Sequence, residues 1–141
     1  MESESDARII LGGRTYGFSG FLPGIIEEFT QAVIERHPVY LLGGFGGAAS
    51  LLVDLIKKEK TVDDVITEAC KNSHYEEFMR FCDINGINMG YDKLKEVVEL
   101  GLDCFDNGLT KEQNTILMRS IDIIEIVGLI INGLKNKIEN A

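Results

Sequence analysis

The segment that decides the fold is PVYLLGGFGGAASLLVDLIKK, residues 38–58. A short apolar run leads into four glycines, Gly43, Gly44, Gly46 and Gly47, and an apolar run with helical spacing leads out. Ordering a glycine costs more conformational entropy than ordering any other residue, so four glycines this close together need a structural or functional reason. The pattern predicts a buried strand, a glycine-rich turn and a helix.

The same order of elements occurs earlier in the chain. The run ARIIL, residues 7–11, ends at two glycines, and PGIIEEFTQAVIER, residues 23–36, has the apolar spacing of a helix that begins near Pro23. Strands that are apolar on both faces are typical of a parallel sheet covered by helices. We therefore predict an α/β fold of three layers, with parallel strands at about residues 7–12 and 38–43.

The second half of the chain is predicted to be almost entirely helical. Thr61 and Thr110 stand at helix starts, Thr110 has Gln113 at the spacing of a capping box, and Ser120 is the expected cap of the last helix. Two strands are too few for a stable open parallel sheet. Three explanations stay open: further strands elsewhere in the chain, a larger fold of which this chain is a part, or a sheet completed by dimerisation.

The last helical segment indicates assembly into an oligomer. The run IDIIEIVGLIINGL, residues 121–134, is apolar around most of its helical circumference. A helix of this kind needs more than one surface to cover it. We therefore expect a homodimer or a higher oligomer that uses this helix.

The composition favours one globular domain. Of the 141 residues, 45% are hydrophobic, and the formal net charge is −9. We expect residues 1–6 to be disordered and residues 7–141 to form the domain. Without a basic stripe the chain is a poor candidate for binding nucleic acid, and no apolar run approaches the ~20 residues of a membrane span. Three cysteines without CxxC spacing indicate reduced thiols in a cytoplasmic protein, and no motif indicates a metal or a cofactor.

Both glycine clusters follow a predicted strand and precede a predicted helix. In open α/β sheets, ligands bind beyond the carboxyl ends of the strands, where a helix N-terminus offers N–H groups and a partial positive charge. The clusters therefore predict a phosphate-binding site of bare backbone, although tight turns with close helix–strand packing would need the same glycines. The candidate residues are Gly12, Gly13, Arg14, Ser19, Gly43, Gly44, Phe45, Gly46 and Gly47.

Side chains in these loops add possible ligand contacts. Arg14 suits a bidentate contact with a phosphate or carboxylate, and Ser19 suits a hydrogen bond to ribose or phosphate. The rings of Tyr16, Phe18 and Phe45 could stack on a base or pack the loops together.

Three stretches together resemble the SLOG superfamily of Rossmann-like nucleotide-binding domains: IILGGR at residues 9–14, PGIIEE at residues 23–28 and PVYLLGGFGGAA at residues 38–49. The superfamily includes cytokinin-activating phosphoribohydrolases and sensor domains of bacterial defence proteins, and it is related to the nucleoside deoxyribosyltransferases. The segment GLTKEQNTILMRSIDIIEIVGLI, residues 108–130, is similar to a segment of the sensor-type members. The family fold has more strands before such a loop, so the resemblance implies that this chain is the C-terminal part of a longer fold or protein.

The resemblance implies two different functions. The first is a sensor module that recognises an ADP-ribose-like or other adenine-nucleotide signal. The alternative is an enzyme that cleaves or transfers nucleotide N-glycosidic bonds, with a catalytic Glu in the family motif PGGxGTxxE.

This motif can be aligned with the chain in two ways. Aligned on LGGFGGAAS, it places Ser50 at the position of the catalytic Glu. Aligned on PGIIEEF, it places Glu28 at that position and leaves TYGFSGFL, residues 15–22, as an insertion. Glu28 also has a structural explanation, because acidic residues in a first helical turn complement the helix dipole. A purely structural interaction domain is a third possibility.

Overall fold

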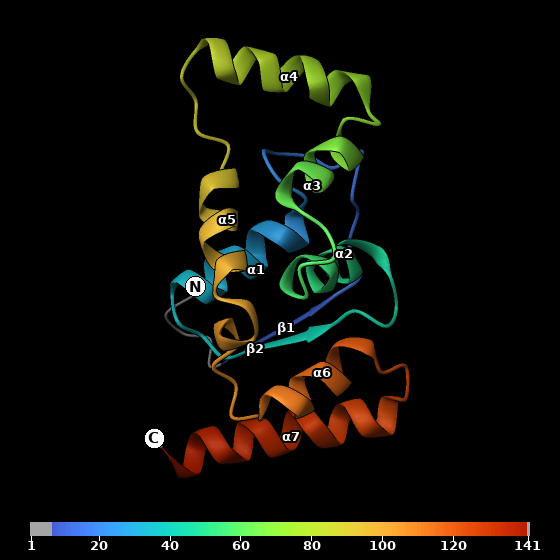
Figure 1. The fold of residues 1–141 in the computed structure, drawn as a ribbon, viewed down its shortest axis with the longest axis vertical. Coiled ribbons are helices and arrows are strands. Elements are labelled where there is room, and N and C mark those ends of the chain that lie inside the picture. Colours follow the sequence, from blue (N-terminus) through green and yellow to red (C-terminus); the bar gives the residue numbers. More distant parts are fainter. Residues whose placement is uncertain (1–6, 141) are drawn as a thin grey trace.

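The computed structural model describes residues 7–140 and contains a mixed α/β fold (Figure 1). Strands β1 (Arg8–Leu11) and β2 (Val39–Leu42) pair in parallel, with Arg8 opposite Val39 and Leu11 opposite Leu42. The expected parallel pair is thus confirmed, and helix α1 (Gly24–Ile34) connects the two strands. The expectation of disorder for residues 1–6 falls outside the described residues.

The second half of the described chain is almost entirely helical, as expected. The remaining elements are α2 (Gly47–Ile56), α3 (Val62–Ala69), α4 (Ser73–Ile84), α5 (Tyr91–Glu99), the 3₁₀ turn η2 (Gly101–Cys104), α6 (Lys111–Arg119) and α7 (Ile123–Glu139).

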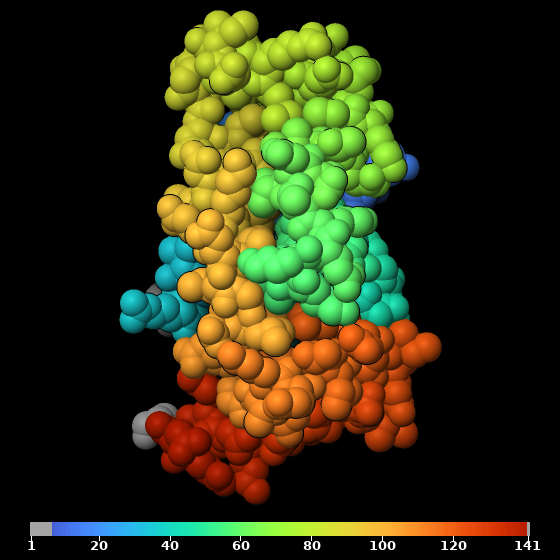
Figure 2. All heavy atoms as spheres, in the orientation of Figure 1, coloured from blue at the N-terminus to red at the C-terminus, as the bar shows by residue number. Residues whose placement is uncertain are grey.

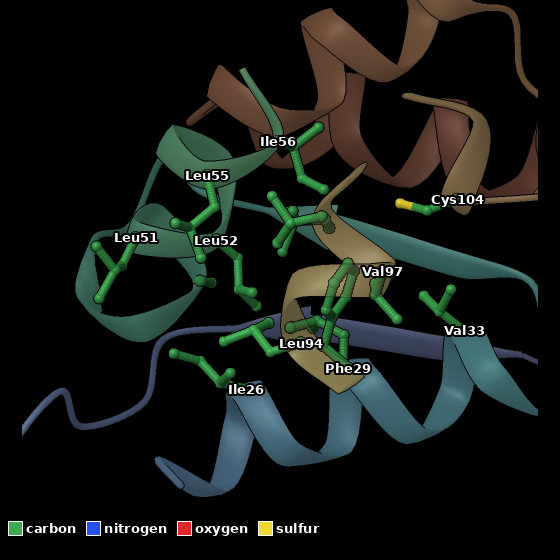
Figure 3. Packing of buried hydrophobic residues seen from close by; sticks show 14 of the residues in the cluster. Ile26, Phe29, Val33, Leu51, Leu52, Leu55, Ile56, Leu94, Val97 and Cys104 are labelled. Carbon is green, nitrogen blue, oxygen red and sulfur yellow. The ribbon is translucent and has the colours of Figure 1, made fainter. Parts of the chain in front are cut away.

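One face of the sheet packs against α1, α2 and α5 (Figure 3). Ile10 from β1 and Leu41 from β2 point to this face, where Phe29, Leu52 and Leu94 are fully buried. The apolar spacing of the helices places one stripe of each against the strands, which is why amphipathic sequence patterns produce this layer. The main hydrophobic core therefore lies between the sheet and these three helices.

The opposite face of β2 packs against α6 and α7. Tyr40 and Leu42 alternate with Leu41 along the strand and pack with Leu117 and Ile126. A buried polar pair joins this layer to the strand: Asn107 Nδ2 donates to the Val39 carbonyl and to Asn114 Oδ1, both at 2.7 Å. The Tyr40 hydroxyl donates to the Asn107 carbonyl at 2.8 Å. Satisfied buried polar groups of this kind fix the register between layers.

In residues 7–140 the sheet has only these two strands. Helices lie on both of its faces, but two strands do not establish the three-layer Rossmann-like sheet that we expected, and that finer arrangement stays a prediction. Ile9 and Leu11 on β1 point to the face that α6 and α7 cover, and yet they are 52% and 49% exposed. The two C-terminal helices thus cover β2 and leave that side of β1 open.

Helix caps follow the sequence signals with one exception. The Thr110 hydroxyl accepts from the Gln113 N–H at 3.1 Å, and Gln113 Oε1 accepts from the Thr110 N–H at 3.0 Å, so the expected capping box is confirmed. The expectation that Ser120 caps the last helix is wrong. Asp122 is the cap, because its carboxylate accepts from the Ile124 N–H at 3.0 Å, while the Ser120 hydroxyl donates to Glu125.

Candidate functional site

The two glycine-rich loops meet at the carboxyl ends of the strands. The N–H groups of Ala48 and Ala49, in the first turn of α2, donate to the carbonyls of Gly13 and Gly12, each at 2.9 Å. These N–H groups are therefore bonded to the first loop and are not open to a ligand. The two loops form one continuous surface whose parts cannot move independently without breaking these bonds.

Close packing accounts for several of the glycines. A Cβ on Gly43 would lie 2.7 Å from the Met118 carbonyl oxygen, and one on Gly44 would lie 2.3 Å from that of Ser120. A Cβ on Gly47 would lie 2.6 Å from the Gly13 carbonyl oxygen. At these positions the chain needs bare backbone for helix–loop contact, whether or not a ligand binds.

Gly46 is different, because no heavy atom lies within 4 Å of the place that its Cβ would occupy. Its φ of +82° places it in the left-handed region, where glycine is strongly favoured. Its N–H donates to the Gly43 carbonyl at 3.2 Å, which closes the turn before α2. Gly46 thus presents bare backbone to open space at the N-terminus of α2.

Two hollows lie where the two loops meet, because Gly13 lines one of them and Gly47 lines the other. The first, of about 370 Å³, is lined by the first loop alone, residues 13–17. The second, of about 290 Å³, lies between α2 and α3 and is lined by Thr15, Gly47, Ser50, Leu51, Asp54, Lys60, Asp64 and Glu68. Thr15 lines both, so the hollows are neighbours.

The second hollow is acidic. Three carboxylates line it against one lysine, and Lys60 Nζ lies 3.5 Å from Asp54 Oδ2. A hydrogen bond from Lys71 lowers the pKa of Glu68, whose Oε1 also accepts from the Thr15 hydroxyl at 3.1 Å. Carboxylates repel phosphate and accept hydrogen bonds from hydroxyl groups. A phosphate therefore fits the first hollow better than the second.

The side chains of the first loop divide into two groups. Phe18 packs edge-on against Tyr75 of α4, with ring centroids 4.9 Å apart, and the Tyr75 hydroxyl donates to the Phe21 carbonyl at 2.6 Å. These contacts hold the part of the loop around Phe18 and Phe21 against α4. Helix α4 forms one end of the molecule (Figure 2). Tyr16 and Phe45 are 54% and 46% exposed, and both stand at the hollows or the neighbouring turn. Ser19 is also exposed.

Arg14 lines the first hollow, and Nη1 of its exposed side chain lies 3.5 Å from the Gly17 carbonyl oxygen. The structure therefore brings Gly12, Gly13, Arg14, Gly46 and Gly47 together. Gly43 and Gly44 lie behind them, against the end of α6.

Glu28 is placed elsewhere. Its Oε1 lies 3.7 Å from Arg8 Nε, at the first residue of β1, whereas the glycine loops follow the last residues of the strands. Glu28 is not among the residues that line either hollow. The structure thus offers this carboxylate an ion-pair partner and does not bring it to the loops.

The acidic residues between α2 and α3 did not emerge from the sequence. Ser50 and Asp54 are four apart, as are Asp64 and Glu68, so each pair shares one helix face. This spacing is a local signal, but that the two faces meet depends on how α3 packs. No group of three or more His, Cys, Asp or Glu residues in the described chain could hold a metal ion, and no helix in residues 7–140 is long and apolar enough to span a bilayer.

The geometry defines a mixed α/β domain with glycine-rich loops at the ends of parallel strands. The model of the family described as SLOG cluster2 matches residues 1–117 of the chain. This match covers well over half of the sequence, and the chain belongs to this family, as the resemblance of its glycine loops led us to expect. Neither a curated protein nor a solved structure matches the chain significantly.

Proposed function

We propose that the chain is a nucleotide-binding sensor module, with an ADP-ribose-like or other adenine-nucleotide ligand at its two glycine loops. Membership of the SLOG cluster2 family supports a nucleotide-related function. The observation that carries the proposal is the junction of the loops, where the Ala48 N–H bonds the Gly13 carbonyl, Gly13 and Arg14 line a hollow, and Gly46 faces open space.

The chemistry of the two hollows suggests an orientation for the ligand. The phosphates lie over the first loop and Gly46, where Arg14 supplies the only formal positive charge of residues 13–17. The sugar lies toward Ser50 and Asp54, whose oxygens accept hydrogen bonds from hydroxyls. The exposed ring of Tyr16 or Phe45 covers the base.

Two features favour binding over hydrolysis. Ser50 stands where the motif of the phosphoribohydrolases has its catalytic Glu, and Glu28 is paired with Arg8. A general acid or nucleophile must reach the reacting atoms, and Glu28 lines neither hollow. We therefore assign Glu28 a structural role and the loops a binding role.

The first test is calorimetric titration with AMP, NAD and ADP-ribose, together with chromatography of the mixtures after incubation. The proposal predicts saturable binding of at least one of these nucleotides and no release of free base. Release of base by the parent protein would favour the glycosidic-bond enzyme, and the absence of binding by all three would remove the support for an adenine-nucleotide ligand.

The nucleotide affinities of two glycine variants test where the ligand binds. Gly46→Ala and Gly86→Ala are a matched pair, because both glycines have positive φ, +82° and +65°, and neither has a heavy atom within 4 Å of the added Cβ. Gly86 lies just beyond α4, away from the glycine loops, so only Gly46→Ala intrudes on the proposed site. We expect Gly46→Ala to weaken binding at least about tenfold, the effect of ~1.4 kcal/mol, and Gly86→Ala to leave it unchanged.

Arg14→Ala should weaken binding by about 1.5–3 kcal/mol, the usual range for hydrogen bonds to charged groups. Circular dichroism and thermal melting establish that each variant is folded. If folded Gly46→Ala and Arg14→Ala bind as tightly as the parent, the glycines serve packing alone and the ligand site lies elsewhere.

A further inference from the structure

Helix α7 carries an apolar strip on the side that faces away from the core. Its core side holds Ile126 and Gly133, which are buried against β2. Ile124, Val127, Ile131 and Ile138 lie on the other side, at 85%, 46%, 59% and 75% exposure, and we call these four residues the α7 strip. Successive members are three, four and seven residues apart, which places them along one line of the helix. Contiguous exposed apolar surface of this kind marks an interaction site.

Helix α7, which carries the strip, lies at the end of the molecule opposite α4 (Figure 1 and Figure 2). Ile9 and Leu11 of β1, which are also half exposed, point to the sheet face on which α7 packs. β1 thus adds a second exposed apolar surface, on the sheet face that α6 and α7 cover only over β2. The strip is separate from the glycine loops, and all four of its residues lie beyond residue 117, where the family match ends.

The strip is complementary to itself. Ile124 and Ile138 are equally distant in sequence from Ile131, so reversing the helix about Ile131 exchanges one isoleucine for the other. An interface between two identical chains related by a two-fold axis requires this property, because the same surface must serve both partners. Exposed Gly128, beside the strip, has no heavy atom within 4 Å of its Cβ position and lets another helix approach closely.

The charges of α7 specify the direction of pairing. Asp122 and Glu125 are at its beginning, and Lys135 and Lys137 outnumber Glu139 at its end. Parallel helices would place like charges and like dipole ends together, whereas antiparallel helices place opposite ones together. We propose that α7 binds α7 of a second copy of this chain, antiparallel, about a two-fold axis at Ile131.

The mass in solution tests the pairing. Light scattering should give twice the chain mass of 15.7 kDa. The matched variants are Ile124→Glu on α7 and Ile84→Glu on α4, because these side chains are 85% and 83% exposed and the change in charge is identical. Ile124→Glu should raise the dimer dissociation constant at least about a hundredfold, because each dimer loses two buried isoleucines, and Ile84→Glu should leave it unchanged.

A glutamate at position 124 lies in the first turn of α7, where it complements the helix dipole, so the variant is expected to fold. A parent protein that stays monomeric at 100 µM would overturn the proposal. So would a dimer that Ile84→Glu disrupts and Ile124→Glu does not, because that result assigns the interface to the exposed apolar side chains of α4.

Crosslinking tests the direction and register. With a short bifunctional maleimide, Ile131→Cys should crosslink to itself, and Ile124→Cys should crosslink to Ile138→Cys in a mixture of the two proteins. Ile124→Cys alone should not crosslink beyond the parent, which controls for the native Cys70. Efficient self-crosslinking of Ile124→Cys would show parallel helices and overturn the antiparallel arrangement.

Discussion

The backbone N–H of Ala48 donates to the carbonyl oxygen of Gly13 at 2.9 Å, and this bond joins the loop after β1 to the helix after β2. It explains why bare backbone occurs in both loops: Gly47 must approach Gly13 closely, because a Cβ at Gly47 would lie 2.6 Å from the same carbonyl oxygen. The junction also fixes the position of Gly46 relative to Arg14. Packing and the proposed ligand site therefore depend on the same few residues.

Gly47→Ala should destabilise the fold more than Gly46→Ala. Both residues have positive φ, +71° and +82°, but only the Cβ at Gly47 meets backbone atoms. We expect Gly47→Ala to lower the free energy of unfolding by more than ~2 kcal/mol and Gly46→Ala by about 1 kcal/mol, as measured by urea denaturation. Equal losses in the two variants would mean that the loops can separate at no cost, contrary to the observed junction.

Asn107→Ala should lower the free energy of unfolding by about 2–4 kcal/mol, because it removes the buried bonds to Val39 and Asn114 and leaves their partners unsatisfied. The exposed Asn140, at the end of α7, supplies a control in Asn140→Ala, for which we expect less than ~0.5 kcal/mol. A loss for Asn107→Ala as small as that of the control would show that the Asn107 side chain contributes little to holding α6 and α7 against β2.

Stability should fall at alkaline pH. Burial raises the pKa of the Cys104 thiol from 9.0 to about 12 and that of the Tyr40 phenol from 10.0 to about 12. The unfolded chain releases these protons at the lower values and the folded chain only near 12, so unfolding is increasingly favoured as the pH rises from about 9 to 12. Urea denaturation at pH 8, 9.5 and 11 measures this effect. In Cys104→Ala the fall should be smaller than in the parent but should persist, because burial also raises the pKa of the Cys70 thiol. A parent stability that is constant from pH 8 to 11 would contradict both assignments.

Glu28→Gln should leave nucleotide affinity within about twofold of the parent, because Glu28 pairs with Arg8 and lines neither hollow at the loops. Calorimetry measures the affinity, and chromatography measures any turnover. If the parent releases free base and Glu28→Gln binds nucleotide without releasing it, the carboxylate is catalytic and its pairing with Arg8 is broken during the reaction.

Local patterns predicted the elements of the fold well. The apolar runs before Gly12 and Gly43 form the parallel strands, and Thr110 and Gln113 form a capping box. Both were predictable because strands, turns and caps depend on residues that are close together in the sequence. Ser120 was misassigned because two cap-forming residues stand close together, and Asp122 has the carboxylate that reaches the first N–H groups of α7.

The candidate site was predictable only in part. The glycines and Arg14 are marked by their position after each strand, but the bonds from Ala48 and Ala49 to the first loop join segments more than 30 residues apart, roughly the length of a βαβ unit. The same limit applies to Asp54 and Glu68, which share a hollow only because α3 packs beside α2. Glu28 satisfied a sequence motif, yet it lies beside Arg8, which no spacing along the chain would reveal.

The most direct test of the central claim, that a nucleotide binds where the glycine loops meet, is an amide NMR titration of the parent protein with ADP-ribose, NAD and AMP. The account predicts that a binding nucleotide shifts the backbone resonances of Arg14, Phe45, Gly46 and Gly47 in proportion to saturation, while those of α4 beyond its contact with the loop, at Asp83 and Ile84, stay in place. Saturable shifts confined to α4 and α5, with the loop resonances unchanged, would contradict it.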